Sequence, residues 1–593
     1  MNEEHKVRMG TLDELRSKGC LTGKAGNQPV CVFWDGEQAR AVDDRCPHMG
    51  FPLHRGTVEA GLLTCHWHHA RFDLETGGTL DPWADDVRAY PVEVEDGVVH
   101  VVVRPPADQV AHLWARLEEG LEQGITLVIA KAVLGLLEAG QPPTEIVRAG
   151  VHFGLANREG GWGPGLTVLV SLANVLGSLD AVDRPVALVQ GLTFLSGDTR
   201  GHAPRFPLSP LPGTIDAPKL AEWYRRFIDS RSADAAERTL ASAVESGHGV
   251  GEVAAMMTAA VTDHVFIDEG HTLDFTNKAF EALEHIGWEE AGRVLPSLVA
   301  QTASARRHEE ESAWRHPHDL VALLRSAEEG LASRLESGRG VDGFDDKAVD
   351  ALAWQMLEDD PVAVVAAIDD AIATGANGEQ LGRAVAYAAA LRIVRFHTQN
   401  DHGDWDVVHH AFTAANALHQ SLVRNTSPEL VRGVYQGALR VYLDRFLNVP
   451  AARLPSSRPS VPLPSAAPGS GSPAALDALA ALAPCWDTEG KVDAAGQVVH
   501  DFLAAGGSAS EVIAALGSAL LAEDAQFHWF QIYEAGVRQA RAWEDGSPQQ
   551  SLVLVAVARF LAAHTPTRRE RRQIVRIASK LRRGETLYEE EIA

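Results

Sequence analysis

Two short segments, each with a cysteine close to a histidine, constrain this chain more than any other feature. Cys46 and His48 flank Pro47, and sixteen residues after His48 comes the segment Cys65-His66-Trp67-His68. In an iron–sulfur cluster, two thiolates can bind one iron and two imidazoles the other, which raises the reduction potential above that of an all-thiolate cluster. A zinc site uses the same residue types and is the alternative interpretation.

The residues around these segments follow the pattern of a known family. The stretch from Phe72 to Gly78, then Pro82, and then the stretch from Tyr90 to Val99 resemble its second cluster loop and closing strands. Over about residues 5–105 the chain is similar to the ferredoxin-like soluble branch of the Rieske [2Fe-2S] family. The resemblance implies a small β-sandwich that carries one electron at a time.

The resemblance also implies a role for each of the four residues. Cys46 and Cys65 would bind the inner iron, and His48 and His68 the outer, more exposed iron from which electrons leave. Neither loop has a spare cysteine for a disulfide, so we expect a low or intermediate potential. His69 stands where related proteins usually have glycine. His66 and His69 are expected to be surface or docking residues.

Composition limits the class of protein and its partners. The chain has 593 residues and a formal net charge of -27, which argues against nucleic acid and anionic membranes and favours a basic electron-transfer partner. Five cysteines are too few for a disulfide framework, so Cys20, Cys31 and Cys485 are expected to be buried or free thiols. With no apolar leader and no long apolar run, we expect a cytoplasmic protein.

The pattern changes from strands to helices after Pro105-Pro106. Alternating, valine-rich stretches at 28–42 and 86–104 predict strands, whereas the alanine- and leucine-rich remainder has the three- and four-residue spacing of helices. The fold class is therefore multi-domain, an all-β Rieske sandwich followed by a large all-α region. The expected domains are residues 1–106, an all-α domain at 107–453, a Pro/Ser/Gly linker at 454–473, and a C-terminal helical unit at 474–593 that packs on the α domain.

A helix–turn–helix pattern recurs in the helical part. In each copy a Glu or Gln follows a Gly by five residues, as expected where the Gly ends one helix and the acid or amide helps to start the next. We interpret these copies as about four related helical units that arose by duplication. The pairs are Gly140 with Glu145, Gly247 with Glu252, Gly375 with Gln380, and Gly506 with Glu511.

Histidines near the ends of these helices predict a second metal site. Neutral imidazoles that converge in a partly apolar pocket suit non-haem iron, mononuclear or dinuclear. A single histidine at a helix end can instead simply bond free carbonyls there. His409 and His410 adjoin, so only one of them is expected to face the site, whereas His308, His316 and His318 are expected at the surface. The tentative ligands are His264, His271, His397, His402, His410 and His528.

The helical region is similar in style to questin-oxidase-like non-haem iron oxygenases. In those proteins an iron-binding lysine can be carboxylated, and Lys278 is its conceivable counterpart, although we expect Lys278 to be an ordinary surface residue. No G-x-G-x-x-G follows a strand, so no nicotinamide or flavin fold is expected. Electrons must then come from a separate reductase or ferredoxin.

Three functions fit the sequence. The first is an oxygenase whose cluster feeds electrons to a His-bound non-haem iron, with O2 and a small apolar substrate, and with a homo-oligomer if transfer occurs between subunits. The second is an electron carrier or redox sensor whose helices bind a partner and hold no second metal. The third is a haem held between the helices and reduced by the Rieske centre.

Overall fold

The computed structural model describes residues 5–26, 28–103, 109–341, 343–401, 403–456, 479–585 and 587. The chain forms two compact units. The first comprises residues 1–142 and 571–593, and the second residues 143–570. His402 and most of the expected linker, residues 457–473, lie outside the described residues.

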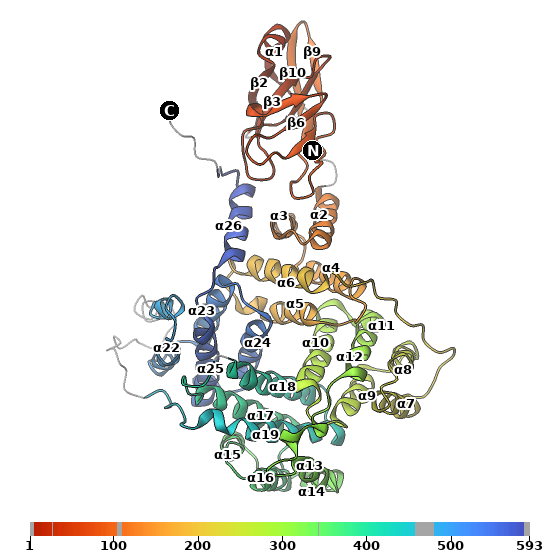
Figure 1. Cartoon of the computed structure of the whole chain (residues 1–593), viewed down its shortest axis with the longest axis vertical. Coiled ribbons are helices and arrows are strands. Elements are labelled where there is room, and N and C mark those ends of the chain that lie inside the picture. The colour runs from red at the N-terminus through yellow and green to blue at the C-terminus, as the bar shows by residue number, and fades with distance from the viewer. Residues whose placement is uncertain are drawn as a thin grey trace. The chain divides into compact units, whose positions relative to one another are not determined.

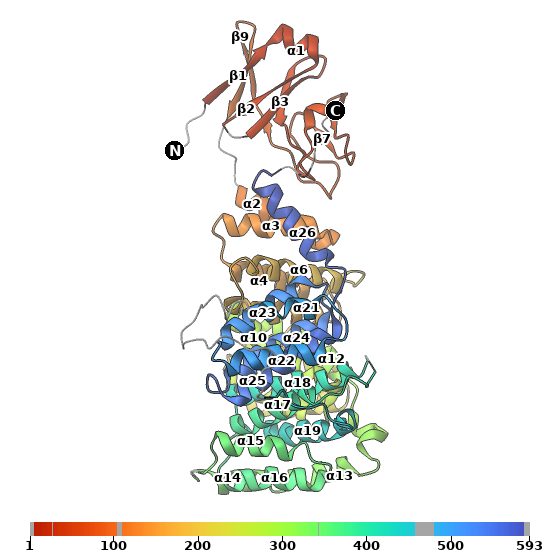
Figure 2. The ribbon, with the colours of Figure 1, turned by 90° about the vertical axis from the view of Figure 1, so that its left-hand side faces the viewer.

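Among the described residues of the first unit, ten strands form three antiparallel sheets, with the orders β1-β10-β9, β2-β3-β4-β8 and β5-β6-β7. The valine-rich sequence of β10 and the valine and aromatic residues of β3 favour extended backbone, and Figure 2 shows β2 and β3 side by side. The predicted N-terminal β domain is confirmed. The strands are β1 (His5–Thr11), β2 (Cys20–Ala25), β3 (Gln28–Trp34), β4 (Ala39–Asp43), β5 (Thr57–Glu59), β6 (Leu62–Thr64), β7 (Arg71–Asp73), β8 (Ala89–Tyr90), β9 (Val92–Glu95) and β10 (Val98–Val103).

Two apolar clusters form the core of this β domain. One lies between β1, β2, β3 and β10, and the other surrounds the Cys46 and Cys65 loops. At Gly77 the backbone comes very close to Val87. The φ of Gly77 is +79°, and a Cβ there would lie 1.9 Å from the carbonyl oxygen of Val87. Only glycine fits such a close backbone approach.

The part of the first unit that the structure describes also contains five helices. The helix pair α2 and α3 packs together, and Arg582 of α26 pairs with Glu138 at the end of α3. The boundary between the compact units therefore falls after Pro142, whereas the sequence placed the domain boundary at residue 106. The helices are α1 (Leu12–Lys18), the 3-10 helix η1 (Leu53–Arg55), α2 (Gln109–Gln123), α3 (Thr126–Glu138) and α26 (Glu570–Arg582), of which Glu570 counts with the second unit.

The second unit is built from helices, and no strand follows Val103 in the described residues. The all-α prediction is thus confirmed. Its helices are α4 (Pro143–Ala156), α5 (Pro164–Val175), η2 (Leu176–Ser178), α6 (Arg184–Thr199), α7 (Ala217–Asp229), α8 (Ala233–Glu245), α9 (Val250–Thr262), η3 (Ile267–Gly270), α10 (His271–Ile286), η4 (Trp288–Glu290), α11 (Ala291–Val294), η5 (Leu295–Leu298), α12 (Val299–Ser304), η6 (His308–Glu310), η7 (Ser312–Trp314), α13 (Leu320–Glu328), α14 (Leu331–Gly338), α15 (Asp346–Gln355), α16 (Pro361–Ala373), α17 (Gly378–Val394), α18 (Asp404–Arg424), α19 (Pro428–Leu443), η8 (Asp444–Asn448), α21 (Ala483–Trp486), α22 (Val492–Ala504), α23 (Ala509–Ala522), α24 (Phe527–Arg541) and α25 (Pro548–His564).

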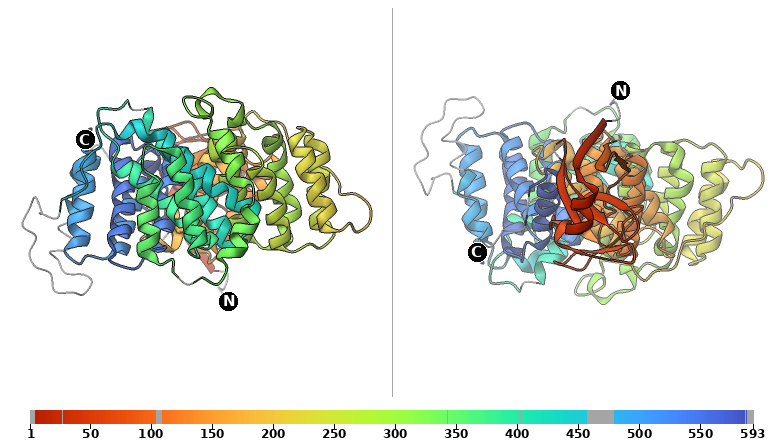
Figure 3. Two further views of the ribbon diagram at one scale, coloured as in Figure 1. Left: turned by 90° about the horizontal axis from the view of Figure 1, so that it is seen from below. Right: turned by 90° about the horizontal axis from the view of Figure 1, so that it is seen from above.

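The alanine-rich helix α17 is buried along almost its whole length and packs against α18 and α25 (Figure 1). Within this unit, α7 and α8 lie at one end and α22 at the other (Figure 3). Helices α10, α18 and α24 lie between these ends and bury many polar side chains. Buried polar groups need partners, so these three helices carry candidate functional side chains.

All four repeated glycines have the local structure that the sequence predicted, and so do three of the four acids or amides that follow them. Gly140, Gly247, Gly375 and Gly506 all adopt positive φ. The side chains of Glu252, Gln380 and Glu511 accept hydrogen bonds from the backbone N–H groups that precede their helices, at 2.9 to 3.1 Å. These bonds satisfy donors that a helix start leaves free. The origin of the four units by duplication stays a prediction.

Candidate functional site

Two matching loops present the four N-terminal candidates. The N–H of Cys46 donates to the carbonyl of Phe51 at 2.8 Å, and the N–H of Gly50 donates back to Cys46 at 2.8 Å. The second loop repeats this pattern between Cys65, His69 and Ala70 at 2.8 and 3.0 Å. The two turns hold each cysteine at the start of its loop with the histidines beyond it.

The two thiols lie together in the core of the domain. Cys46 is 2% exposed and Cys65 is 1% exposed. A hydrogen bond with the Cys46 thiol lowers the pKa of Cys65 to about 6, although burial opposes this shift. The backbone N–H groups of Trp67 and His68 act in the same direction. The same thiol pair and burial raise the pKa of Cys46. Backbone N–H groups aimed at sulfur stabilise thiolates, which is what an iron-binding pair requires.

The two imidazoles lie together as well. The His48 and His68 ring centroids are 4.9 Å apart, and the Trp83 ring packs 4.7 Å from His48. Burial, followed by the charges of Lys131 and His68, lowers the pKa of His48 to about 4. His48 is half-buried, whereas His68 is exposed. Buried sulfur pairs and outer nitrogen pairs match the donor set of an asymmetric [2Fe-2S] centre.

His66 and His69 do not join these four residues. The His66 Nε2 atom lies 2.5 Å from the Thr57 hydroxyl, and both histidines are exposed. His69 has a φ of +64°, the left-handed region that favours glycine. A histidine therefore stands here at a conformational cost, at the edge where His68 is exposed.

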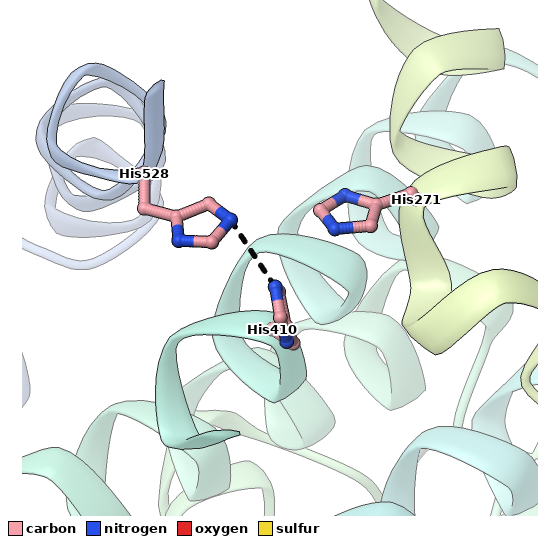
Figure 4. Close-up of side chains that lie close together, drawn as sticks. All are labelled: His271, His410 and His528. Atoms are coloured by element: carbon pink, nitrogen blue, oxygen red, sulfur yellow. Dashed lines mark hydrogen bonds between the residues drawn. The ribbon is translucent and has the colours of Figure 1, made fainter. Parts of the chain in front are cut away.

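Three histidines from separate helices converge in the second unit. They are His271 at the start of α10, His410 in α18 and His528 at the start of α24, and one nitrogen of each lies within 4.8 Å of the others (Figure 4). His410 Nε2 and His528 Nε2 are 3.2 Å apart. Burial, then the neighbouring His410 and His528, lowers the pKa of His271 to about 3. Neutral imidazoles gathered in this way are a common transition-metal donor set.

Two of the three histidines have a carboxylate at their Nδ1 atom. Glu269 Oε2 lies 3.1 Å from His410 Nδ1, and Asp406 Oδ1 lies 3.2 Å from His528 Nδ1. The hydrogen bond with His410 lowers the pKa of Glu269 to about 2. A carboxylate at Nδ1 favours the tautomer with its proton there, which leaves the Nε2 lone pair free for a metal.

A strained turn delivers His271 and Glu269 to the site. Phe266, Asp268 and Glu269 all adopt positive φ, at 41°, 51° and 56°. Gly270 follows with a φ of +90°, and a Cβ there would lie 2.4 Å from that of Ala414 in α18. Backbone strain of this kind persists where surrounding structure enforces it, and it concentrates at functional sites.

A fourth histidine lies directly behind the three. His409 is fully buried, its ring centroid is 4.3 Å from that of His528, and neither of its nitrogens has a hydrogen-bond partner in the described residues. Burial, with the neighbouring histidines, places the pKa of His409 well below its usual value. The sequence expected one of His409 and His410 to face the site, and His410 is the one that meets His271 and His528.

Two of the remaining sequence candidates lie elsewhere. His264 is held by Glu309, with Nδ1 2.9 Å from Oε1, and His397 accepts a hydrogen bond from the backbone N–H of Gln399 at 3.2 Å. Neither belongs to the group formed by His271, His410 and His528. His402 lies outside the described residues.

Two surface assignments were wrong. His308 is only 5% exposed, because its Nε2 accepts from the Glu269 N–H and its Nδ1 lies 3.1 Å from Glu311. Lys278 is 1% exposed and donates to Glu281 and Glu534 at 2.8 Å each. These acids raise the pKa of Lys278 although burial opposes them. His316 and His318 are exposed, as expected.

Lys278 belongs to a buried polar seam between α10 and α24, two helical turns after His271. Gln531 donates to Asp274, and Arg538 pairs with Glu534 at 3.2 Å. Burial raises the pKa of Asp274 to about 7. No local pattern predicts this seam, because Gln531 and Glu534 are more than 250 residues from their partners Asp274 and Lys278.

Comparisons with known proteins agree with the N-terminal geometry. The profile of the Rieske [2Fe-2S] domain matches residues 5–91. The anthranilate 1,2-dioxygenase ferredoxin subunit of Burkholderia cepacia is 34% identical over 96 residues, which are 16% of this chain and 89% of that protein. The 4beta-methylsterol monooxygenase of Methylococcus capsulatus is 35% identical over 92 residues, 14% of this chain and 25% of that one.

Among solved structures, the ferredoxin of carbazole 1,9a-dioxygenase from Nocardioides aromaticivorans is 31% identical, and the alignment covers 16% of this chain and 95% of that one with a TM-score of 0.16. The family match ends at residue 91, before α2 begins at Gln109. Through its N-terminal residues, the chain belongs to the Rieske [2Fe-2S] family.

Proposed function

We propose that this protein is an oxidoreductase of the oxygenase type, in which the Rieske cluster supplies electrons to an iron held by His271, His410 and His528. Cys46, Cys65, His48 and His68 would hold the [2Fe-2S] cluster. A separate reductase or ferredoxin would reduce it. The single observation that carries the proposal is the convergence of three histidine nitrogens within 4.8 Å.

The chemistry of the donor set favours a metal over a purely structural histidine cluster. With a proton on each Nδ1, as Glu269 and Asp406 favour, His410 and His528 would point two lone pairs at each other across 3.2 Å. A cation at that point removes this repulsion, and three imidazoles leave positions open on iron for other ligands. Iron in such a site supplies O2 chemistry when it is reduced.

The surroundings of the site support an apolar substrate. The rings of Phe275 and Phe527 lie 5.5 and 5.8 Å from that of His271, and 6.0 Å from each other. Aromatic rings beside a few polar groups are typical of sites for small organic molecules. The substrate's reacting carbon would be held against this aromatic wall.

A small cavity beside the site suits dioxygen. It has a volume of about 30 Å³, and its walls include Gly270 next to His271 and Ala414 one turn after His410. Its polar walls are already bonded: Thr262 donates to the Glu429 carbonyl at 2.8 Å, and Gln436 bonds Phe266 and Thr262 at 3.0 and 2.9 Å. Water needs two to four polar partners, and an apolar cavity of roughly 150 Å³ is needed for benzene. The cavity therefore favours a small apolar gas over water or an aromatic ring.

Iron content of the anaerobically purified, fully loaded protein tests the proposal. We expect more iron than one [2Fe-2S] cluster contains, and loss of only the excess in His271→Ala, His410→Ala and His528→Ala. The exposed His316→Ala is the matched control and should retain all iron. Cluster iron alone, unchanged in the three variants, would leave the electron-carrier function suggested by the ferredoxin-subunit relatives. A Soret band would indicate haem instead.

A further inference from the structure

A buried lysine that lies beyond the family match donates hydrogen bonds to the first cluster loop, the loop of Cys46 and His48. Lys131 of α3 is 8% exposed, and its Nζ donates to the carbonyls of Pro47 at 2.5 Å and His48 at 3.1 Å. Asp85 Oδ2 lies 3.9 Å from the same Nζ. An ammonium offers three donors, so two carbonyls and a carboxylate are partners that fit its charge.

An arginine from the adjacent helix binds the loop on the other side of His48. Arg116 of α2 donates to Asp85 at 2.6 Å and to the carbonyls of Pro82 and Ala84 at 3.1 and 2.9 Å. Between these carbonyls stands Trp83, whose ring packs on His48. The α2–α3 pair, residues 109–138, therefore holds both loops that surround this histidine.

From these contacts we propose that Lys131 is a positioning residue of the cluster, one that holds the His48 loop and raises the cluster's reduction potential. The inference rests on the cluster ligands proposed above, but not on the second metal site. The Rieske match ends at residue 91, so α2 and α3 add a cation that the matched domain does not itself contain.

The sign of the effect follows from charge. Reduction adds one electron to the cluster, and a nearby cation stabilises the added negative charge, most strongly where water is excluded. Asp85 is an anion 3.9 Å from Lys131, so its charge lowers the reduction potential of the cluster. Arg116 and Arg45 are the other cations that face Lys131, and both remain unchanged in the variants below.

An EPR-monitored redox titration of the full-length, cluster-loaded protein tests the inference. We expect a lower midpoint potential in Lys131→Met, a higher one in Asp85→Asn, and a value close to wild type in Lys131→Arg. Opposite shifts from two neighbours cannot come from a general loosening of the loop. Lys18→Met, at an exposed position of α1, is the control and should not shift.

Three results would overturn the inference. They are a wild-type potential in Lys131→Met, shifts of the same sign in Lys131→Met and Asp85→Asn, or an equal shift in Lys18→Met. If Lys131→Met fails to take up the cluster, Asp85→Asn and Lys131→Arg decide by the same criteria. Absence of a Rieske EPR signal in the wild-type protein would instead contradict the proposed cluster ligands, so the two failures are distinguishable.

Discussion

His410 Nε2 lies 3.2 Å from His528 Nε2, and the Nδ1 atom of each ring faces a carboxylate. His271 completes the group from a third helix.

The first prediction concerns the acid behind His528. Asp406→Asn should weaken metal binding at the three histidines by about 10- to 100-fold, because the carboxylate orients the ring and raises the basicity of Nε2. Competition titration with a metal chelator measures this affinity. Asp401→Asn, at an exposed position just before α18, is the control. Equal affinities in wild type and Asp406→Asn would contradict the supporting role.

The second prediction concerns pH and Asp274. Burial raises its pKa to about 7 in the folded protein, above the value of about 3.9 in an unfolded chain. The folded state therefore binds the extra proton, and its contribution to stability is full below pH about 4 and is lost as pH rises through about 7. Asp274→Asn should remove this loss, of the order of a few kcal/mol. Urea unfolding of both proteins across this pH range measures it, and parallel pH profiles would refute it.

The third prediction concerns the buried seam. Lys278→Met should destabilise the protein by about 3–5 kcal/mol, because it removes the buried ammonium between Glu281 and Glu534 and leaves Arg538 to balance both carboxylates. Lys347→Met, exposed on α15, should change stability by less than about 0.5 kcal/mol. Urea unfolding at neutral pH compares the two. Similar values for both variants would show that the seam is not needed for stability.

The fourth prediction concerns the second cluster loop. Gly77→Ala would place a Cβ 1.9 Å from the Val87 carbonyl oxygen, so the loop must move and the cluster should be lost after incubation at a lower temperature, as shown by the Rieske EPR signal that remains in the frozen samples. Gly61→Ala shares the φ of +79° but has nothing within 4 Å, and should cost only about 1–2 kcal/mol for the left-handed backbone. The incubation temperature at which half of the EPR signal is lost is compared between the two variants. Equal losses would mean that backbone conformation alone, not the close approach, makes glycine necessary.

Local sequence patterns were enough to predict the N-terminal site and the alternation of helices and turns. Cys46, His48, Cys65 and His68 lie in two loops that the sequence itself marks, and the glycines that end helices carry their own conformational signal. The structure forms the expected turns here because their hydrogen bonds span only a few residues, and the binding of a cluster by these four residues stays a prediction.

The second site could be predicted only in part. His271 and His528 stand at helix starts, where the repeat pattern drew attention to them, and His410 followed from its place in the third repeat. His264 lies outside the group of His271, His410 and His528 and contacts Glu309, through an interaction that no local pattern reveals. The surface position predicted for Lys278 was wrong, because its partner Glu534 lies 256 residues away and no local pattern reveals the contact.

The wide separation of the three histidines along the chain has a further consequence. His410 and His528 alone are 118 residues apart, so an ion bound by both would act as a removable cross-link between distant parts of the second unit. Closing a long loop takes conformational freedom from the denatured chain, and an ion that binds only the native form raises the melting temperature as its concentration increases. Iron starvation would then loosen α10, α18 and α24 together and make the same protein susceptible to proteolysis.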